Sequence, residues 1–156
     1  MKVAFDQQVF LLQEYGGISL YICSLVKELE LTPDMQTEVV IPLHFNHNLA
    51  VMEHLAGALR LIPRVSTKLF RLVAFASKHL ARRSISRFRS DILHDAYYSV
   101  DDYKASGAKR LLTVYDLIHQ LCPELFERSH MTTESKKAAV QRTDNIIWIS
   151  ERTRRD

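Results

Sequence analysis

The chain contains 156 residues, of which 47% are hydrophobic and 25% are charged. These values predict one globular domain with a single core and exclude two domains of ordinary size. No apolar run approaches the roughly 20 residues that cross a bilayer, which excludes a membrane-spanning helix. The net charge of +3 is unevenly spread, because residues 54–90 carry nine of the 21 Lys and Arg residues and no Asp or Glu.

The first part of the chain predicts a strand followed by a helix. Residues 2–5 form a β-prone apolar run, and residues 6–12 are predicted as the loop that follows this strand. Gly16 and Gly17 come next, at the start of a predicted helix. Apolar side chains recur in that helix at positions 18, 21, 22, 25, 26 and 29.

The middle of the chain predicts a second strand and then a long helical region. Pro33 ends the first helix, and residues 37–43 are predicted as a buried, β-branched strand. Residues 46–89 follow a helical pattern, which Pro63 should divide into at least two helices. One face of this region is marked by Ile62, Val65, Leu69, Leu72, Ala76 and Leu80.

The last third predicts three more strands and two helices. The strands are expected at residues 91–98, 110–115 and 145–149, and a short polar helix is expected at 132–141. Ser150 is a plausible N-cap for a helix that begins at Glu151. Since strand and helix alternate throughout, the sequence predicts an α/β, Rossmann-like three-layer domain with a mainly parallel sheet.

The glycine pair has two competing interpretations. In a parallel α/β domain, a glycine turn before the first helix can bind a phosphate through backbone N–H groups and the helix dipole. Two glycines in a loop are also common as simple turn formers. The three-glycine dinucleotide fingerprint is absent, which argues against NAD.

Five blocks of the sequence, taken in order, resemble the N-terminal domain of family-4 glycosyltransferases. They are MKVAFDQQVF, YGGISLYICSLVKEL, DILHDAYYS, LLTVYDLIHQLCPELF and TDNIIWISERTRRD. Residues 46–89 show no such resemblance. The resemblance implies half of a GT-B fold, with residues 1–156 as a single acceptor-side domain whose C-terminal, donor-binding domain is absent.

That resemblance also implies a function. We expect the acceptor-side half of a retaining hexosyltransferase in bacterial surface polysaccharide synthesis, with mannose as one candidate sugar. The donor would be a nucleotide-diphosphate sugar, with no tightly bound cofactor, and the acceptor a saccharide or a lipid-linked saccharide. By itself, the domain should be inactive.

The resemblance assigns roles to particular residues. Gly16 and Gly17 would contact the donor diphosphate, and Asp116 and His119 would be catalytic by orienting sugar hydroxyls. His94, Tyr97 and Tyr98, at the end of the third predicted strand, would bind the acceptor. Each has an alternative: His119 as a strand-end cap, and the three acceptor residues as core or crevice wall.

Four residues depart from the family pattern, and three of them, Leu20, Gln120 and Leu121, place catalysis in doubt. Leu20 stands where an arginine is common, and Gln120 and Leu121 stand where a glutamate and a basic or bulky residue are frequent. Tyr115 stands where many relatives have a histidine. The changes toward apolar surface favour a second hypothesis, a non-catalytic Rossmann-like module that self-associates or binds a partner through its cleft face.

Partners and location follow from charge and cysteine content. The basic helices of residues 60–89 suit either peripheral contact with anionic lipid or a solvated basic face. Thin aromatic interleaving argues against nucleic acid, and His44 and His47 lack the neighbours of a metal site. Two distant cysteines and the lack of a leader pattern predict a reduced, cytoplasmic protein, with the inner membrane face as one location.

Overall fold

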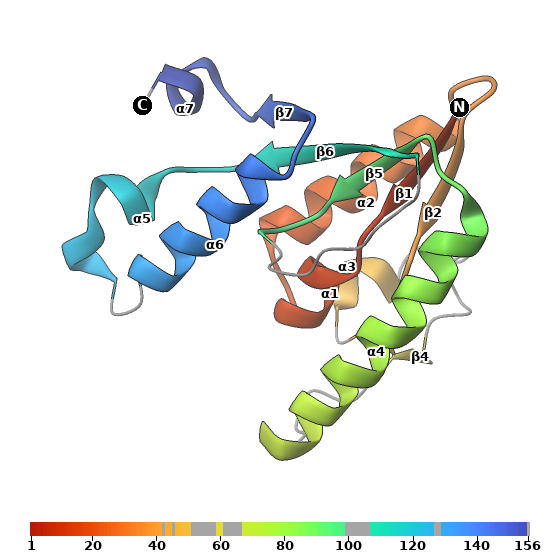
Figure 1. Ribbon diagram of the computed structural model, residues 1–156, viewed down its shortest axis with the longest axis horizontal. Coiled ribbons are helices and arrows are strands. Elements are labelled where there is room, and N and C mark those ends of the chain that lie inside the picture. Colours follow the sequence, from red (N-terminus) through yellow and green to blue (C-terminus); the bar gives the residue numbers. More distant parts are fainter. Residues whose placement is uncertain are drawn as a thin grey trace.

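The computed structural model describes residues 1–41, 43–44, 46–50, 59–60, 67–98, 107–126 and 129–155. It is a Rossmann-like α/β structure built on a five-stranded sheet with every strand parallel to its neighbours, in the order β2-β1-β5-β6-β7 (Figure 1). The strands are β1 (Lys2–Phe5), β2 (Gln36–Val39), β5 (Ile92–Asp95), β6 (Lys109–Val114) and β7 (Asn145–Trp148).

Helices connect the strands. The longer ones are α2 (Gly17–Glu30), α4 (Thr67–Phe88) and α6 (Ser129–Gln141). The shorter ones are α1 (Gln8–Leu12), α3 (His47–Ala50), α5 (Ile118–Leu121), the 3₁₀ turn η2 (Pro123–Leu125) and α7 (Glu151–Arg155). A second, two-stranded parallel sheet pairs β3 (Leu43–His44) with β4 (Leu59–Arg60).

Successive side chains of β1 point to opposite faces of the main sheet, and helices cover both faces. Val3 and Phe5 belong to a buried cluster with Ile22 and Val26 of α2. Ala4, between them, points to the other face and packs in a cluster with residues of α4. On β6, Leu112 and Val114 pack in a further cluster with Ala139 of α6. The result is three layers, as expected when β-α-β crossovers keep one hand.

The sequence predicted the five main strands and the helices that begin at Gly17 and at Glu151. Ser150 caps the second of these, since its Oγ accepts the backbone N–H of Thr153 at 3.1 Å. The prediction of a loop over residues 6–12 was wrong. Val9 and Phe10 are fully buried on the helix α1, because this one-turn helix packs against α2.

The prediction of at least two helices within residues 46–89 is confirmed by α3 and α4, but the helical pattern was wrong for residues 59–60. Leu59 and Arg60 form β4, paired with β3, and Pro63 lies outside the described residues. Among the α4 side chains that the structure describes, at residues 72–88, the buried ones are Ser77, Ala81 and Ile85. The predicted apolar face, by contrast, leaves Leu72, Ala76 and Leu80 exposed, so the sheet covers a different side of this helix.

The strand order reverses beside β1, because β2 lies on one side of it and β5 on the other. In open parallel sheets, ligands bind outside the carboxyl ends of the strands at such a point. No described helix is both long and apolar enough to cross a membrane.

Candidate functional site

The candidate site is the carboxyl edge of the sheet, where β1 and β5 end side by side. The backbone N–H of Asp6 donates to the carbonyl of His94 at 3.1 Å, which continues the pairing beyond the end of β1. The segments that leave this edge carry Gly16 and Gly17, Tyr97 and Tyr98, and Asp116. The structure thus brings most of the predicted site residues to one edge.

Gly16 and Gly17 form the start of α2, as the sequence predicted. Gly16 is the N-cap residue, and its carbonyl accepts the N–H of Leu20 at 3.1 Å and the hydroxyl of Ser19 at 2.9 Å. Because glycine has no side chain, the N-cap residue makes no side-chain hydrogen bond to this end of the helix. A Cβ added to Gly17 would meet no atom within 4 Å, so this glycine faces open space.

Gly16 lies against the end of the Gln13 side chain. Its backbone is extended, with φ of 174°, a conformation that any residue adopts. A Cβ at this position, however, would collide with the side-chain amide of Gln13. Since the Gln13 amide is the end of a flexible side chain and can move, neither the backbone nor the packing at this position requires glycine.

A distant segment, Asn46 to Asn48, holds the glycine loop in place. Asn46 Nδ2 donates to the carbonyl of Gln13 at 2.7 Å, and the N–H of His47 donates to the carbonyl of Glu14 at 2.9 Å. Asn48 Nδ2 donates to the Gly16 carbonyl at 3.1 Å. We call these contacts between residues 46–48 and the glycine loop the clasp. The sequence analysis missed the clasp, because the partners are about 30 residues apart and no local pattern marks them.

The clasp has an aromatic component on its outer side. The rings of Tyr15 and His47 are stacked, with centroids 4.1 Å apart and planes at 11°. His47 Nε2 also lies 3.3 Å from the Glu14 carboxylate. Both contacts fix the loop from the solvent side, which leaves the N–H groups at the start of α2 preorganised.

Asp6 is a buried carboxyl group at the switch point that the sequence analysis did not select. Its Oδ1 accepts the N–H groups of Gln8 at 3.2 Å and Ala96 at 3.0 Å, which ties the β1 and β5 turns together. Its Oδ2 is buried without a hydrogen-bond partner among the described residues. Burial, and then the neighbouring Asp95, hold the pKa of Asp6 well above its usual value.

His94 lies within β5 rather than beyond it, and its ring is buried in the sheet. Its Nε2 lies 2.9 Å from Thr113 Oγ1 of β6, and its ring packs at 5.0 Å from that of Phe5. Burial lowers the pKa of His94 to about 4, so the imidazole is neutral. In this position the ring joins two strands and presents almost no surface to a ligand.

Four tyrosines surround the ends of β5 and β6. The Tyr98 hydroxyl accepts the N–H of Tyr115 at 3.2 Å, and the Tyr115 hydroxyl donates to the carbonyl of Ala96 at 3.3 Å. The ring of Tyr21, on α2, meets Tyr115 edge-on at 5.8 Å, which links the glycine helix to this corner. Tyr98 is buried, whereas Tyr97 is half-buried at the edge.

Asp116 follows β6 and is exposed. Its Oδ1 accepts the N–H of Ile118 at 3.2 Å, which starts α5. His119 lies on α5, where its ring meets that of Phe126 edge-on at 4.2 Å. Its Nδ1 is buried without a hydrogen-bond partner in the described part of the chain, although the residue as a whole is only half-buried.

Lys136 of α6 holds the segment that follows β6 in place through hydrogen bonds. Its Nζ donates to the Asp116 carbonyl at 2.6 Å and to Gln120 Oε1 at 3.1 Å, and it lies 4.8 Å from the centre of the Tyr98 ring. Its side chain is only 4% exposed, and burial lowers its pKa. Sequence reasoning placed it on an unremarkable polar helix and missed it.

Lys136 also gives Gln120 a role. This amide stands where the family resemblance leads one to expect a glutamate, and its oxygen is directed to Lys136 rather than left without a partner. Leu121, the next residue, is exposed. Exposed apolar side chains are frequent around this edge: Leu12, Tyr15, Leu20, Ile118, Leu121 and Leu125.

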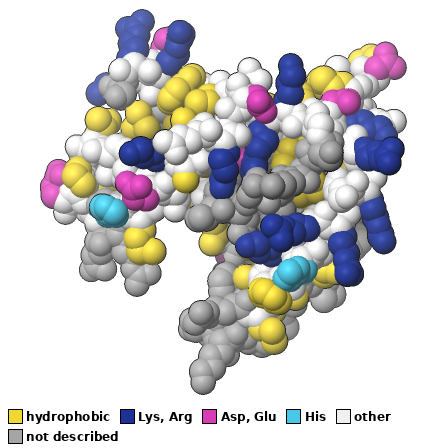
Figure 2. Space-filling model, viewed as in Figure 1, with side chains coloured by type: hydrophobic (Ala, Val, Ile, Leu, Met, Phe, Trp, Pro, Cys, Tyr) yellow, Lys and Arg dark blue, Asp and Glu magenta, His cyan; other side chains and the backbone are white. Residues whose placement is uncertain are grey.

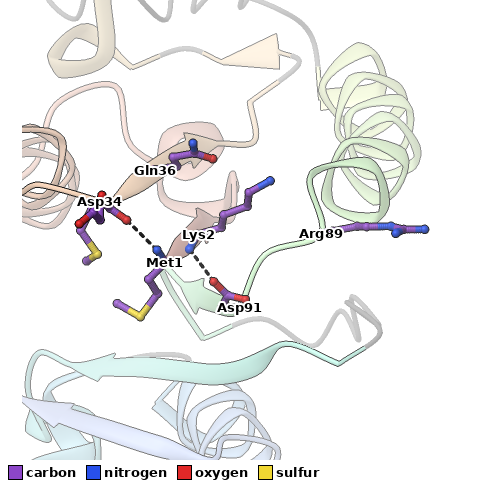
Figure 3. A pocket seen from close by; sticks show the side chains of 7 residues that line it. Met1, Lys2, Asp34, Gln36, Arg89 and Asp91 are labelled. Atoms are coloured by element: carbon purple, nitrogen blue, oxygen red, sulfur yellow. Dashed lines mark hydrogen bonds between the residues drawn. The ribbon is translucent and has the colours of Figure 1, made fainter.

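A hollow of about 560 Å³ lies at the opposite, amino edge of the sheet (Figure 3). There the terminal amine donates to the Asp34 carbonyl at 2.6 Å, and the N–H of Lys2 donates to Asp91 Oδ2 at 2.7 Å. Arg89 also lines it, and Figure 3 shows its side chain extending away from the other residues. The hollow is lined by groups of both charges, and it lies away from the strand ends where α/β domains bind ligands.

The carboxyl edge combines a preorganised helix N-terminus, a buried acid and a tyrosine-lined corner, which suits a ligand with an anionic group and hydroxyls. The described residues include no group of three His, Cys, Asp or Glu side chains that could hold a metal ion. Comparisons with protein-family models, with curated proteins and with solved structures found no match for the chain.

Proposed function

We propose that the carboxyl edge binds the diphosphate of a nucleotide sugar, and that the chain serves as the acceptor-side half of a retaining hexosyltransferase. The observation that carries this proposal is the clasped glycine loop at the start of α2, beside the point where the strand order reverses. A 14-residue helix has a full dipole, and its first N–H groups lie next to a glycine with open space.

In this function the glycine loop would stabilise charge on the departing diphosphate through fixed backbone dipoles. Asp116 and the half-buried Tyr97 would position sugar hydroxyls, since both are accessible at the same corner. A second domain across the edge would supply the rest of the donor site. The choice of a hexosyl donor and of a polysaccharide acceptor comes from the sequence resemblance.

The first test uses Leu20, which is 56% exposed in the first turn of α2. Leu20→Arg would place a cation beside the proposed diphosphate and should tighten binding of UDP or GDP several-fold in calorimetry. Leu31→Arg is the matched control, because Leu31 is 72% exposed at the other end of the same helix. Equal affinities for the two variants would contradict the proposal.

Gly17→Asp tests the same site, because it should raise the stability of the protein but weaken its binding of diphosphate. A carboxylate in the first helical turn favours the dipole by roughly 0.3–1 kcal/mol, and the open space at Gly17 accepts the side chain. The same charge should repel a diphosphate and weaken its binding at least tenfold. A variant that is more stable and binds diphosphate as well as the original chain would exclude this helix end as the site.

The apolar rim supports a second candidate function, a non-catalytic module that uses this edge as an interface. Leu20, Leu121 and Leu125 are all more than half exposed there, and clustered exposed apolar side chains mark interaction surfaces. Sedimentation velocity over a range of concentrations tests it. Association that Leu121→Ser and Leu125→Ser abolish, without any diphosphate binding, would favour the module over the enzyme.

A further inference from the structure

We infer that the outer face of α4 docks on an anionic lipid bilayer. This outer face is defined by Leu72, Phe75, Ala76, Leu80, Arg83 and Arg87. The inference is independent of the proposed diphosphate site, because α4 packs on the sheet face opposite to the one that α2 covers. Figure 1 shows the amino-terminal end of α4 extending away from the sheet.

The outer face has apolar side chains that the core does not use. The sheet is met by Ser77, Ala81 and Ile85, all fully buried. On the outer side, Leu72 is 63% exposed and Phe75 is 61% exposed. The Phe75 ring makes an edge contact with the ring of His79, one turn away, with centroids 4.5 Å apart.

Cations lie next to these apolar side chains. Arg83 and Arg87 are exposed about two and three turns beyond Ala76 on the same helix. Residues 54–90 carry nine Lys and Arg residues and no Asp or Glu, so no acid along this stretch offsets them. Figure 2 shows dark-blue cations beside yellow apolar side chains over this helix.

An anionic bilayer is the partner that suits both kinds of side chain. Exposed leucine and phenylalanine side chains at helical spacing can enter the boundary between headgroups and acyl chains, while arginines two to four turns further along the same face remain at the phosphates. A duplex nucleic acid would engage the arginines but would leave Leu72 and Phe75 in water. A second copy of the chain would bring like charges together.

Vesicle co-sedimentation at low salt tests the inference on the full chain. Vesicles of phosphatidylcholine with 30% phosphatidylglycerol should bind it, and vesicles of phosphatidylcholine alone should not. Arg83→Gln with Arg87→Gln should weaken binding roughly 30-fold, and Leu72→Ser with Phe75→Ser at least tenfold. Because all four residues are exposed, these variants should keep the far-ultraviolet circular dichroism of the original chain.

Matched controls change the same residue types elsewhere. Arg154→Gln with Arg155→Gln, and Leu31→Ser with Leu125→Ser, remove exposed side chains from outside α4 and should leave vesicle binding unchanged. Equal binding to neutral and anionic vesicles, or equal losses in test and control variants, would overturn the inference. So would concentration-dependent self-association that Leu72→Ser with Phe75→Ser abolishes, or binding to duplex DNA without binding to vesicles.

Discussion

Asp6 follows β1, and hydrogen bonds satisfy only part of its buried carboxyl group. Its carboxyl group bridges two turns through Oδ1, yet its other oxygen is buried without a partner among the described residues. An acid in this environment favours its protonated form. Buried ionisable groups with shifted pKa values are common at functional sites, where a group must be held in a particular protonation state.

Asp6→Asn should stabilise the protein at neutral pH. Since the folded-state pKa of Asp6 is raised, the folded chain keeps a proton that the unfolded chain releases above about pH 4, and stability falls as pH rises through that window. The gain from Asp6→Asn should therefore be near zero at pH 4 and grow above it, by up to about 1.4 kcal/mol per pH unit. Urea unfolding between pH 4 and 8 measures it.

The comparison must be made between the variant and the original chain, because His94 titrates in the opposite sense. Its folded pKa of about 4 lies below the ordinary 6.5, so its contribution is lost as pH falls from 6.5 toward 4. This term is common to both proteins and cancels in the difference. A difference that stays constant from pH 4 to 8 would show that Asp6 is not protonated in the folded state.

At the scale of elements, α5 depends on a contact with another helix. It has only four residues, and its N-cap residue provides no side-chain hydrogen bond. Isolated helices of this length are unstable in water. Lys136 supplies the missing support by donating to Asp116 and Gln120, at the two ends of the turn.

Lys136→Met should loosen α5 while leaving the sheet intact. Methionine can still pack on the Tyr98 ring, but it makes neither hydrogen bond. We expect the amide protons of Leu121 and Cys122, which bond within α5, to exchange about tenfold faster or more, equivalent to ~1.4 kcal/mol of local stability. Lys137→Met, at the exposed neighbouring position, should have no such effect; equal protection in both variants would refute the anchor.

At the scale of the whole molecule, one buried ion pair joins two central strands. Arg110 of β6 donates from Nε and Nη2 to the carboxylate of Asp95 on β5, at distances of 2.8 to 3.2 Å. Asp95 is fully buried, and Asp6 lies close enough to interact with both groups. The pair therefore joins β5 and β6 close to the carboxyl group that follows β1.

Arg110→Met should lower the free energy of unfolding by about 3–5 kcal/mol, because it leaves the buried Asp95 carboxylate without this guanidinium. The double variant with Asp95→Leu should recover most of that loss, since both polar groups are then removed. Arg154→Met removes an exposed ion pair with Glu151 and should cost less than about 1 kcal/mol. Denaturant unfolding distinguishes these cases, and equal costs for the two arginines would contradict the burial argument.

The sequence by itself determined the alternation of strands and helices, the glycines at the start of α2 and the Ser150 cap. These features depend on periodicity and turn chemistry within a few residues, so they can be seen without the fold. The same local evidence predicted Asp116 at a strand end. It failed for α1, where burial of Val9 and Phe10 overrides an apparent loop.

Only the tertiary structure decided which side of α4 faces the sheet, that His94 is a core residue, and that Asp6, Lys136 and the Asn46 to Asn48 segment belong to the site. A helix with apolar residues on more than one side carries no local signal for which side is buried. The clasp and the lysine anchor act across 16 to 33 residues of chain. Such contacts arise when parallel strands bring distant segments to one edge, which no local pattern encodes.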